Sequence, residues 1–84
     1  MHLVSRFVAE AIVFEVGSDS DNVITNTDEG IEVLVAPCEL DMNAITEYVT
    51  IQHGGTQDAQ DDINDAFSEV DLTSNLLVTF FWEE

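Results

Sequence analysis

The first apolar stretch of the chain, residues 3–16, fits two kinds of element. As a helix it would place Arg6 and Glu10 together on an outer face, opposite its apolar residues. The later part, residues 11–16, is rich in β-branched and aromatic side chains, which is typical of a strand. We favour a single long strand over residues 3–16, and because it is apolar on both faces we expect it to be central in its sheet or covered on its outer side. The alternative helix would bury Leu3, Val4, Phe7, Val8, Ala11 and Ile12.

Three shorter apolar stretches, separated by clusters of turn residues, predict the remaining strands. Residues 22–26 and 31–36 flank a polar loop of the hairpin type, and Pro37 ends the second of them. Residues 75–82 are apolar almost throughout, so we expect a final strand that is mostly buried. Together the strands fit an antiparallel meander.

The middle of the chain shows the period of a helix instead. Asp41 is a suitable N-cap for a helix over residues 42–53, and two glycines follow its end. Thr56 can cap a second helix over residues 57–70. The apolar stripe of this second helix consists of Ala59, Ile63, Ala66, Phe67 and Val70.

These elements predict an α+β fold in a single acidic domain that comprises residues 1–84. An antiparallel sheet of about four strands would carry two helices packed on one face. A chain of this length has room for one hydrophobic core. The predicted strands cover residues 3–16, 22–26, 31–36 and 75–82, and the predicted helices cover residues 42–53 and 57–70.

Charge changes this picture more than any motif does. The chain has 18 Asp and Glu against one Arg and no Lys, a formal net charge of −17 in 84 residues. Solubility of a small domain needs only about 2–8 charges, and repulsion of this size destabilises a compact state. Apolar residues nevertheless make up 45% of the chain, which is more than a disordered acidic chain contains. We therefore expect a folded domain whose acids lie on its surface, with only Arg6 to pair with them.

The predicted helix over residues 57–70 carries a row of acids beside its apolar stripe. Like charges one turn apart destabilise a helix by roughly 0.2–0.5 kcal/mol per pair, and no Lys or Arg in this segment relieves them. We interpret the row as a candidate binding site, against the ordinary alternative of a solvated acidic face. We also expect neutral replacements of Asp61, Asp62 and Asp65 to leave or raise the stability of the fold, because repulsion is relieved. The row consists of Asp58, Asp61, Asp62, Asp65 and Glu69.

The spacing of such a row suits a surface built for nucleic acid. Carboxylates one turn apart on a helix are separated by about 5–6 Å, and phosphates along one strand advance by about 3.4 Å per nucleotide. A rigid row of carboxylates can therefore sit among Lys and Arg side chains that normally hold a phosphate backbone. Acids outside the helix would extend the row if they share its side. These are Asp19, Asp21, Asp28 and Glu29 in two loops, and Glu83 and Glu84 at the end of the sequence.

No motif for a metal, a cofactor or catalysis occurs in the sequence. Residues 19–22 look like the start of a calcium loop, but the later ligand positions of that loop hold other residue types. His2, His53 and Cys38 lack zinc-type spacing, and a single cysteine cannot form an internal disulfide. We expect Cys38 to be a small buried side chain. We also expect no enzymatic activity, no cofactor and no metal.

In size, single-domain organisation and near absence of basic residues, the chain resembles the small acidic proteins with which viruses and mobile elements block nucleic-acid-binding enzymes. Anti-CRISPR, anti-restriction and glycosylase-inhibitor proteins belong to this class. The resemblance covers the whole chain and is compositional, since no motif carries it. It implies a stoichiometric inhibitor that occupies a DNA- or RNA-binding surface without catalysis, in the cytoplasm, or in the host cell cytoplasm if the protein is viral.

The expected partner is a basic nucleic-acid-binding protein or nucleoprotein complex. We expect no direct binding to nucleic acid or to a membrane, because anionic surfaces repel this chain. Two other classes stay open. One is a small structural or subunit protein of a halophile, whose solvent shortens the screening length to about 3 Å at 1 M salt. The other is an acidic module that binds a basic protein without imitating DNA, and a homodimer through the apolar strand ends is also left open.

Overall fold

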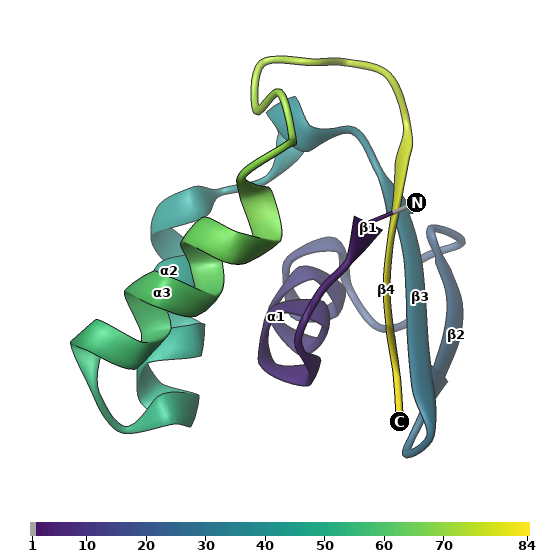
Figure 1. The fold of residues 1–84 in the computed structure, drawn as a ribbon. Helices are drawn as coiled ribbons and strands as arrows, with labels where there is room; N and C mark the ends of the chain where they lie inside the picture. The colour runs from purple at the N-terminus through teal and green to yellow at the C-terminus, as the bar shows by residue number, and fades with distance from the viewer. Residues whose placement is uncertain (1) are drawn as a thin grey trace.

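A four-stranded sheet with three helices on one side forms the fold in the computed structural model, which describes residues 2–84 (Figure 1). The α+β class is confirmed. None of the helices in the described residues is both long enough and apolar enough to cross a membrane. The elements in chain order are β1 (His2–Leu3), α1 (Arg6–Val16), β2 (Val23–Thr27), β3 (Gly30–Val35), the 3₁₀ turn η1 (Pro37–Glu39), α2 (Met42–His53), α3 (Thr56–Phe67) and β4 (Val78–Glu83).

The sheet is mixed rather than purely antiparallel. Its strand order is β1-β4-β3-β2, in which β4 pairs antiparallel with β3 and parallel with β1. The short strand β1 places Leu3 beside Phe81, and the N–H of Val4 donates to the carbonyl of Phe81 at 2.8 Å. The expected antiparallel sheet is therefore wrong at one pair. β1 is followed by α1 and not by a hairpin, and its neighbour β4 is the last strand of the sequence, so no tight turn between them imposes an antiparallel direction.

The largest correction concerns residues 3–16, which form β1 and helix α1 and not one long strand. Ser5 caps α1, since its side-chain oxygen accepts the N–H of Val8 at 3.2 Å. Gly17 ends the helix with a φ of 94°, which a residue with a Cβ rarely adopts. The alternative helical interpretation also placed Arg6 beside Glu10, and the two side chains form an ion pair at 2.7 Å.

Helix α1 looks like a strand in the sequence because it is buried on two sides. It lies against β3 and β4 on one side, and α2 and α3 pack against it from the other (Figure 1). A helix in this position needs apolar side chains nearly all round, so the usual 3.6-residue alternation is weak. Tertiary packing has overridden the β propensity of its branched side chains. Its buried residues are Val8, Ala9, Ala11, Ile12 and Val13.

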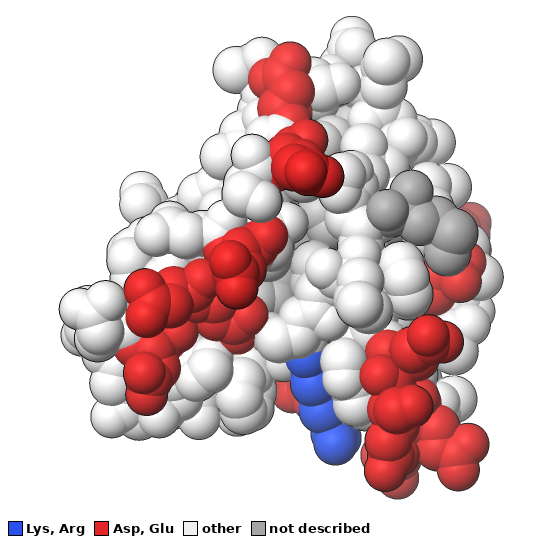
Figure 2. Space-filling view, viewed as in Figure 1, with Lys and Arg blue, Asp and Glu red and all other residues white. Residues whose placement is uncertain are grey.

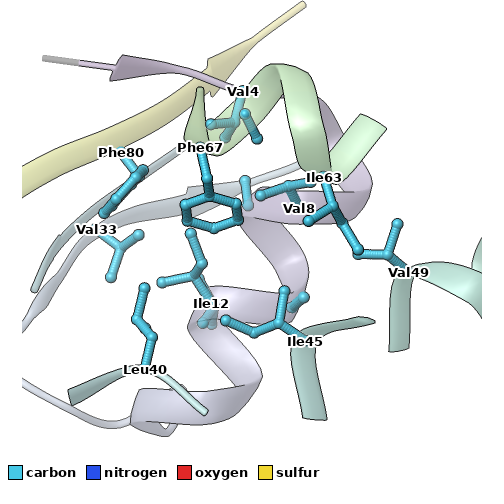
Figure 3. Packing of buried hydrophobic residues seen from close by; sticks show 14 of the residues in the cluster. Val4, Val8, Ile12, Val33, Leu40, Ile45, Val49, Ile63, Phe67 and Phe80 are labelled. Atoms are coloured by element: carbon cyan, nitrogen blue, oxygen red, sulfur yellow. The ribbon is translucent and has the colours of Figure 1, made fainter. Parts of the chain in front are cut away.

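One hydrophobic core joins the sheet, α1 and the α2–α3 pair (Figure 3). Phe80 of β4 is fully buried, and its ring lies 5.6 Å from the ring of Phe67 at the end of α3. Ile12 of α1 and Ile45 of α2 meet below these rings. In residues 2–84 no charged or polar side chain is buried, so the core holds none of the 18 acids.

The predicted helix over residues 42–53 is confirmed in its bounds and caps. The Asp41 carboxylate accepts the N–H groups of Asn43 and Ala44 at 3.0 and 3.3 Å. Gly54 ends the helix in the left-handed conformation, with a φ of 71°. These are local interactions, which explains why the sequence was sufficient to predict them.

The second predicted helix differs slightly at both ends. Gly55 is the N-cap, without a side-chain hydrogen bond, and Thr56 is the first helical residue rather than the cap. The helix ends at Phe67, so Glu69 and Val70 lie beyond it.

The three later strands shift by a few residues from their predicted bounds. The predicted strands 22–26 and 31–36 are observed as Val23–Thr27 and Gly30–Val35, and the predicted 75–82 as Val78–Glu83. Leu76 and Leu77 precede β4 and are largely exposed, which corrects the expectation of a mostly buried strand there. The reason is that β4 begins where Val78 meets Val35, the last residue of β3.

Phe80 and Phe14 differ in burial, and the sequence alone does not predict which of the two contributes more to stability. We expect Phe80→Ala to lower the free energy of unfolding by about 3–5 kcal/mol, because it empties the centre of the core. Phe14→Ala is the matched control and should cost less than about 1 kcal/mol, because Phe14 is 75% exposed. Urea unfolding of both variants measures the difference. Equal losses would contradict the observed packing of α1.

Candidate functional site

The exposed acids of the candidate site fall into three groups. The α3 row consists of Asp58, Asp61 and Asp65 on the solvent side of α3, with Glu69 in the turn that follows the helix. The sheet-end group consists of Asp28, Glu29, Glu83 and Glu84. The loop pair consists of Asp19 and Asp21, between α1 and β2.

The α3 row is held in place by the opposite side of its helix. Ala59, Ile63, Ala66 and Phe67 of α3 belong to the hydrophobic core, which fixes the rotation of the helix about its axis. Asp58, Asp61 and Asp65 then emerge at successive turns. Their axial span is about 10 Å at a rise of about 1.5 Å per residue.

Asp62 stands apart from its neighbours because its carboxylate is bound within the protein. Its Oδ2 atom accepts the Ser5 hydroxyl at 2.6 Å and lies 2.8 Å from Nε2 of His53. The Asp62 side chain is only 14% exposed. The His53 ring in turn meets the edge of Phe7 at a centroid distance of 4.6 Å. Asp62 thus ties the start of α1 and the end of α2 to α3.

The sheet-end group forms where the β2–β3 turn meets the end of β4. Asp28 and Glu29 occupy the turn, and Gly30 pairs with Glu83 in the β3–β4 register. The N–H of Glu84 donates to the carbonyl of Glu29 at 3.0 Å. Residues more than fifty positions apart in the sequence therefore present their carboxylates together.

Figure 2 shows the α3 row and the sheet-end group on one side of the molecule, with the single basic side chain between them. The loop pair lies elsewhere. The N–H of Leu34 donates to the carbonyl of Asn22, whereas the turn with Asp28 is at the other end of the same hairpin. The length of β3 separates the loop pair from the sheet-end group by about 17 Å at a rise of about 3.3 Å per residue.

Arg6, the one basic side chain of the Lys and Arg type, is engaged by neighbours. Its Nε donates to Oε1 of Glu10 at 2.7 Å, and its guanidinium carbon lies 5.2 Å from the centre of the Trp82 ring. The hydrogen bond to Glu10 raises the pKa of Arg6 above its ordinary value. Glu10 also accepts the hydroxyl of Tyr48 at 3.2 Å.

Burial raises the pKa of Tyr48, and the charge of Glu10 and its hydrogen bond raise it further. Tyr48 comes from α2 and Glu10 from α1, so this contact joins the two helices beside the single arginine.

The sequence did not point to Ser5, His53 or Tyr48 as residues that organise this surface. Ser5 stands directly before the first helical residue, which is a usable capping signal once residues 6–16 are taken as a helix. The partners of His53 and Tyr48 come from other elements, and no spacing rule connects them.

No group of three or more His, Cys, Asp or Glu side chains within residues 2–84 is arranged to hold a metal ion. Cys38 is exposed in η1, which corrects the expectation that it is buried. The turn buries the preceding Pro37 instead. Comparison of the chain with protein-family models, with curated proteins and with solved structures finds no match. Function is therefore inferred from the surface itself.

The contacts of Asp62 reverse the effect on fold stability that the sequence predicts for a neutral replacement of this residue. We expect Asp62→Ala to lower the free energy of unfolding by about 1–3 kcal/mol, because Ser5 and His53 lose a shared, mostly buried acceptor. The control Asp65→Ala, at an exposed position, should be neutral or stabilising by up to about 0.5 kcal/mol, since it relieves repulsion and favours the helix. Denaturant unfolding measures both. A harmless Asp62→Ala would contradict the structural role of this carboxylate.

Tyr48 is the single tyrosine of the chain, so the ultraviolet absorbance of tyrosinate reports on it alone. We expect its titration midpoint to lie above the ordinary value of about 10. Because the pKa is raised in the folded state, its contribution to stability is complete below the ordinary pKa and is lost as pH rises through the raised pKa. Glu10→Gln should lower the midpoint without removing the whole shift, since burial is the first cause. A midpoint equal to that of the urea-unfolded chain would contradict the contact.

Proposed function

We propose that the protein is a non-enzymatic inhibitor that imitates nucleic acid and blocks the basic surface of a DNA- or RNA-binding protein or nucleoprotein. One observation carries the proposal. The α3 row and the sheet-end group share one side of a domain that measures 31 × 30 × 19 Å, and its single arginine already has an acidic partner.

The spacing of the α3 row supports this function. Neighbouring carboxylates on the helix are about 5–6 Å apart, which is shorter than the Debye length of about 8 Å at physiological ionic strength. Their fields therefore add rather than act separately. The axial span of about 10 Å matches roughly three nucleotide steps of a phosphate backbone.

Rigidity supports it as well. The row stands on a helix whose other side is in the core, and the bound carboxylate of Asp62 fixes α3 against α1 and α2. A row that is held before binding loses little conformational freedom in the complex. Asp62 acts in this proposal as a support, and Asp58, Asp61 and Asp65 act as the anionic contacts.

The near-uniform sign of the surface defines the class of partner. Association with a Lys- and Arg-rich groove is fast and is weakened by salt, because the two potentials are complementary. The same charge opposes binding to nucleic acid and to anionic lipid. An acidic module for a basic protein that binds no nucleic acid would use the same charge, and competition with duplex DNA separates it from a mimic.

The test removes three charges from the α3 row and compares the effect with the loss of three charges elsewhere. Proteins of a cell extract are first selected by their binding to duplex DNA and are then passed over the immobilised chain. We expect a retained protein to be released by excess duplex DNA, and D58N/D61N/D65N to lower its association rate by about tenfold or more. The control D19N/D21N/E39Q removes the same charge from exposed positions outside the row and should have a much smaller effect.

Three results would contradict the proposal in different ways. Retention that survives excess duplex DNA indicates an acidic module that does not imitate nucleic acid. Equal losses in the two triple variants indicate an effect of total charge. A chain that unfolds in about 50 mM KCl and folds only in about 2 M KCl, as followed by circular dichroism, indicates adaptation to high salt.

A further inference from the structure

Two large apolar side chains are exposed at the junction of α1 and α2. Phe14 of α1 is 75% exposed and Ile51 of α2 is 68% exposed. Tyr48 lies between them, and its ring is 5.8 Å from the ring of Phe14. The α2 residues Ala44, Tyr48 and Ile51 are spaced by four and three positions, so they share one side of the helix.

The two helices enclose a hollow here, which we call the α1–α2 groove. Its volume is about 280 Å³, and Ala11 and Ala44 line it together with the three larger apolar side chains. Ala11 is 2% exposed and so belongs to the floor of the groove. Beyond the Phe14–Tyr48 ring pair a second hollow of about 450 Å³ follows, lined by Val13 and Gly17 among others.

Acids border the α1–α2 groove from both helices. Glu15 of α1 and Glu47 of α2 line it. Neither takes part in an ion pair in the part of the chain that the structure describes, where Arg6 pairs with Glu10 and His53 with Asp62. The groove therefore combines an apolar floor with uncompensated negative charge on opposite borders.

We propose that the α1–α2 groove is a docking site for a basic amphipathic helix of a partner protein. The apolar side of such a helix would cover Phe14 and Ile51, and its Lys and Arg side chains would reach Glu15 and Glu47. Grooves between helices accept amphipathic helices through apolar anchors one turn apart. An added strand does not fit, because the backbone groups along α1 and α2 are already paired within the helices.

Charge argues against a second copy of this chain as the occupant. A symmetric pair would set the Glu15 and Glu47 borders of both copies against each other, in addition to the repulsion of two chains of charge −17. The groove shares no residue with the α3 row or the sheet-end group. It is therefore a second surface, and the proposal of a docking site there does not depend on the proposed imitation of nucleic acid.

The test uses two synthetic peptides of identical Leu and Lys composition, one amphipathic as a helix and one scrambled. Binding is measured in about 0.15 M salt by calorimetry and by amide chemical shifts. We expect the amphipathic peptide to bind at least about tenfold more tightly than the scrambled peptide. We also expect it to shift the amide resonances of Ala11, Phe14, Ala44 and Ile51.

Matched variants separate the groove from general charge. F14A/I51A should weaken binding of the amphipathic peptide by about tenfold or more. I24A/L76A, which removes two apolar side chains exposed elsewhere, should leave the affinity unchanged. E15Q/E47Q should weaken binding more than D19N/D21N, a control with the same loss of charge.

Several outcomes would overturn the inference. Equal binding of the scrambled peptide, or amide shifts confined to the α3 row, would show attraction by charge alone. A chain that sediments as a dimer and becomes monomeric in F14A/I51A would show that a second copy covers the groove. None of these outcomes bears on D58N/D61N/D65N and the competition with duplex DNA, so the two proposals fail separately.

Discussion

The burial of α1 between the sheet and the α2–α3 pair is the constraint on which the rest of the structure depends. A helix in this position contributes apolar contacts on two sides, which lets 84 residues build a continuous core. The position of α1 also determines how the neighbouring strands and helices are arranged. β1 leads into α1, the Ser5 cap contacts Asp62 of α3, and Glu10 contacts Tyr48 of α2.

This arrangement explains how a chain of charge −17 stays folded. No acid enters the core in the described residues, so burial of apolar surface acts without a desolvated charge to oppose it. Arg6 and His53 are both placed at junctions between elements. Arg6 joins α1 to Trp82 of β4, and His53 joins α2 to Asp62 of α3. The acids of the α3 row and of the sheet-end group face solvent, where a partner can reach them.

The molecule thus offers two surfaces of different chemistry. One is anionic and rigid, and we propose that it imitates a phosphate backbone. The other is an apolar groove with acidic borders, suited to a helix of a basic protein. A partner that binds nucleic acid and also presents a basic amphipathic helix would satisfy both surfaces. Such a partner would gain affinity from the two contacts together if their spacing allows simultaneous engagement.

The sequence by itself determined what depends on neighbours along the chain. The caps at Asp41 and Gly54, the apolar stripe of α3 and the acidity of the surface follow from spacing and composition, because capping and helical periodicity are local. Tertiary structure decided what depends on distant segments. Residues 6–16 form a helix because two layers bury them. Asp62 does not face solvent with the other acids of α3, because Ser5, 57 positions away, and His53 bind its carboxylate. A carboxylate that is free and one that is bound look alike in a sequence, since the difference lies in which segments meet.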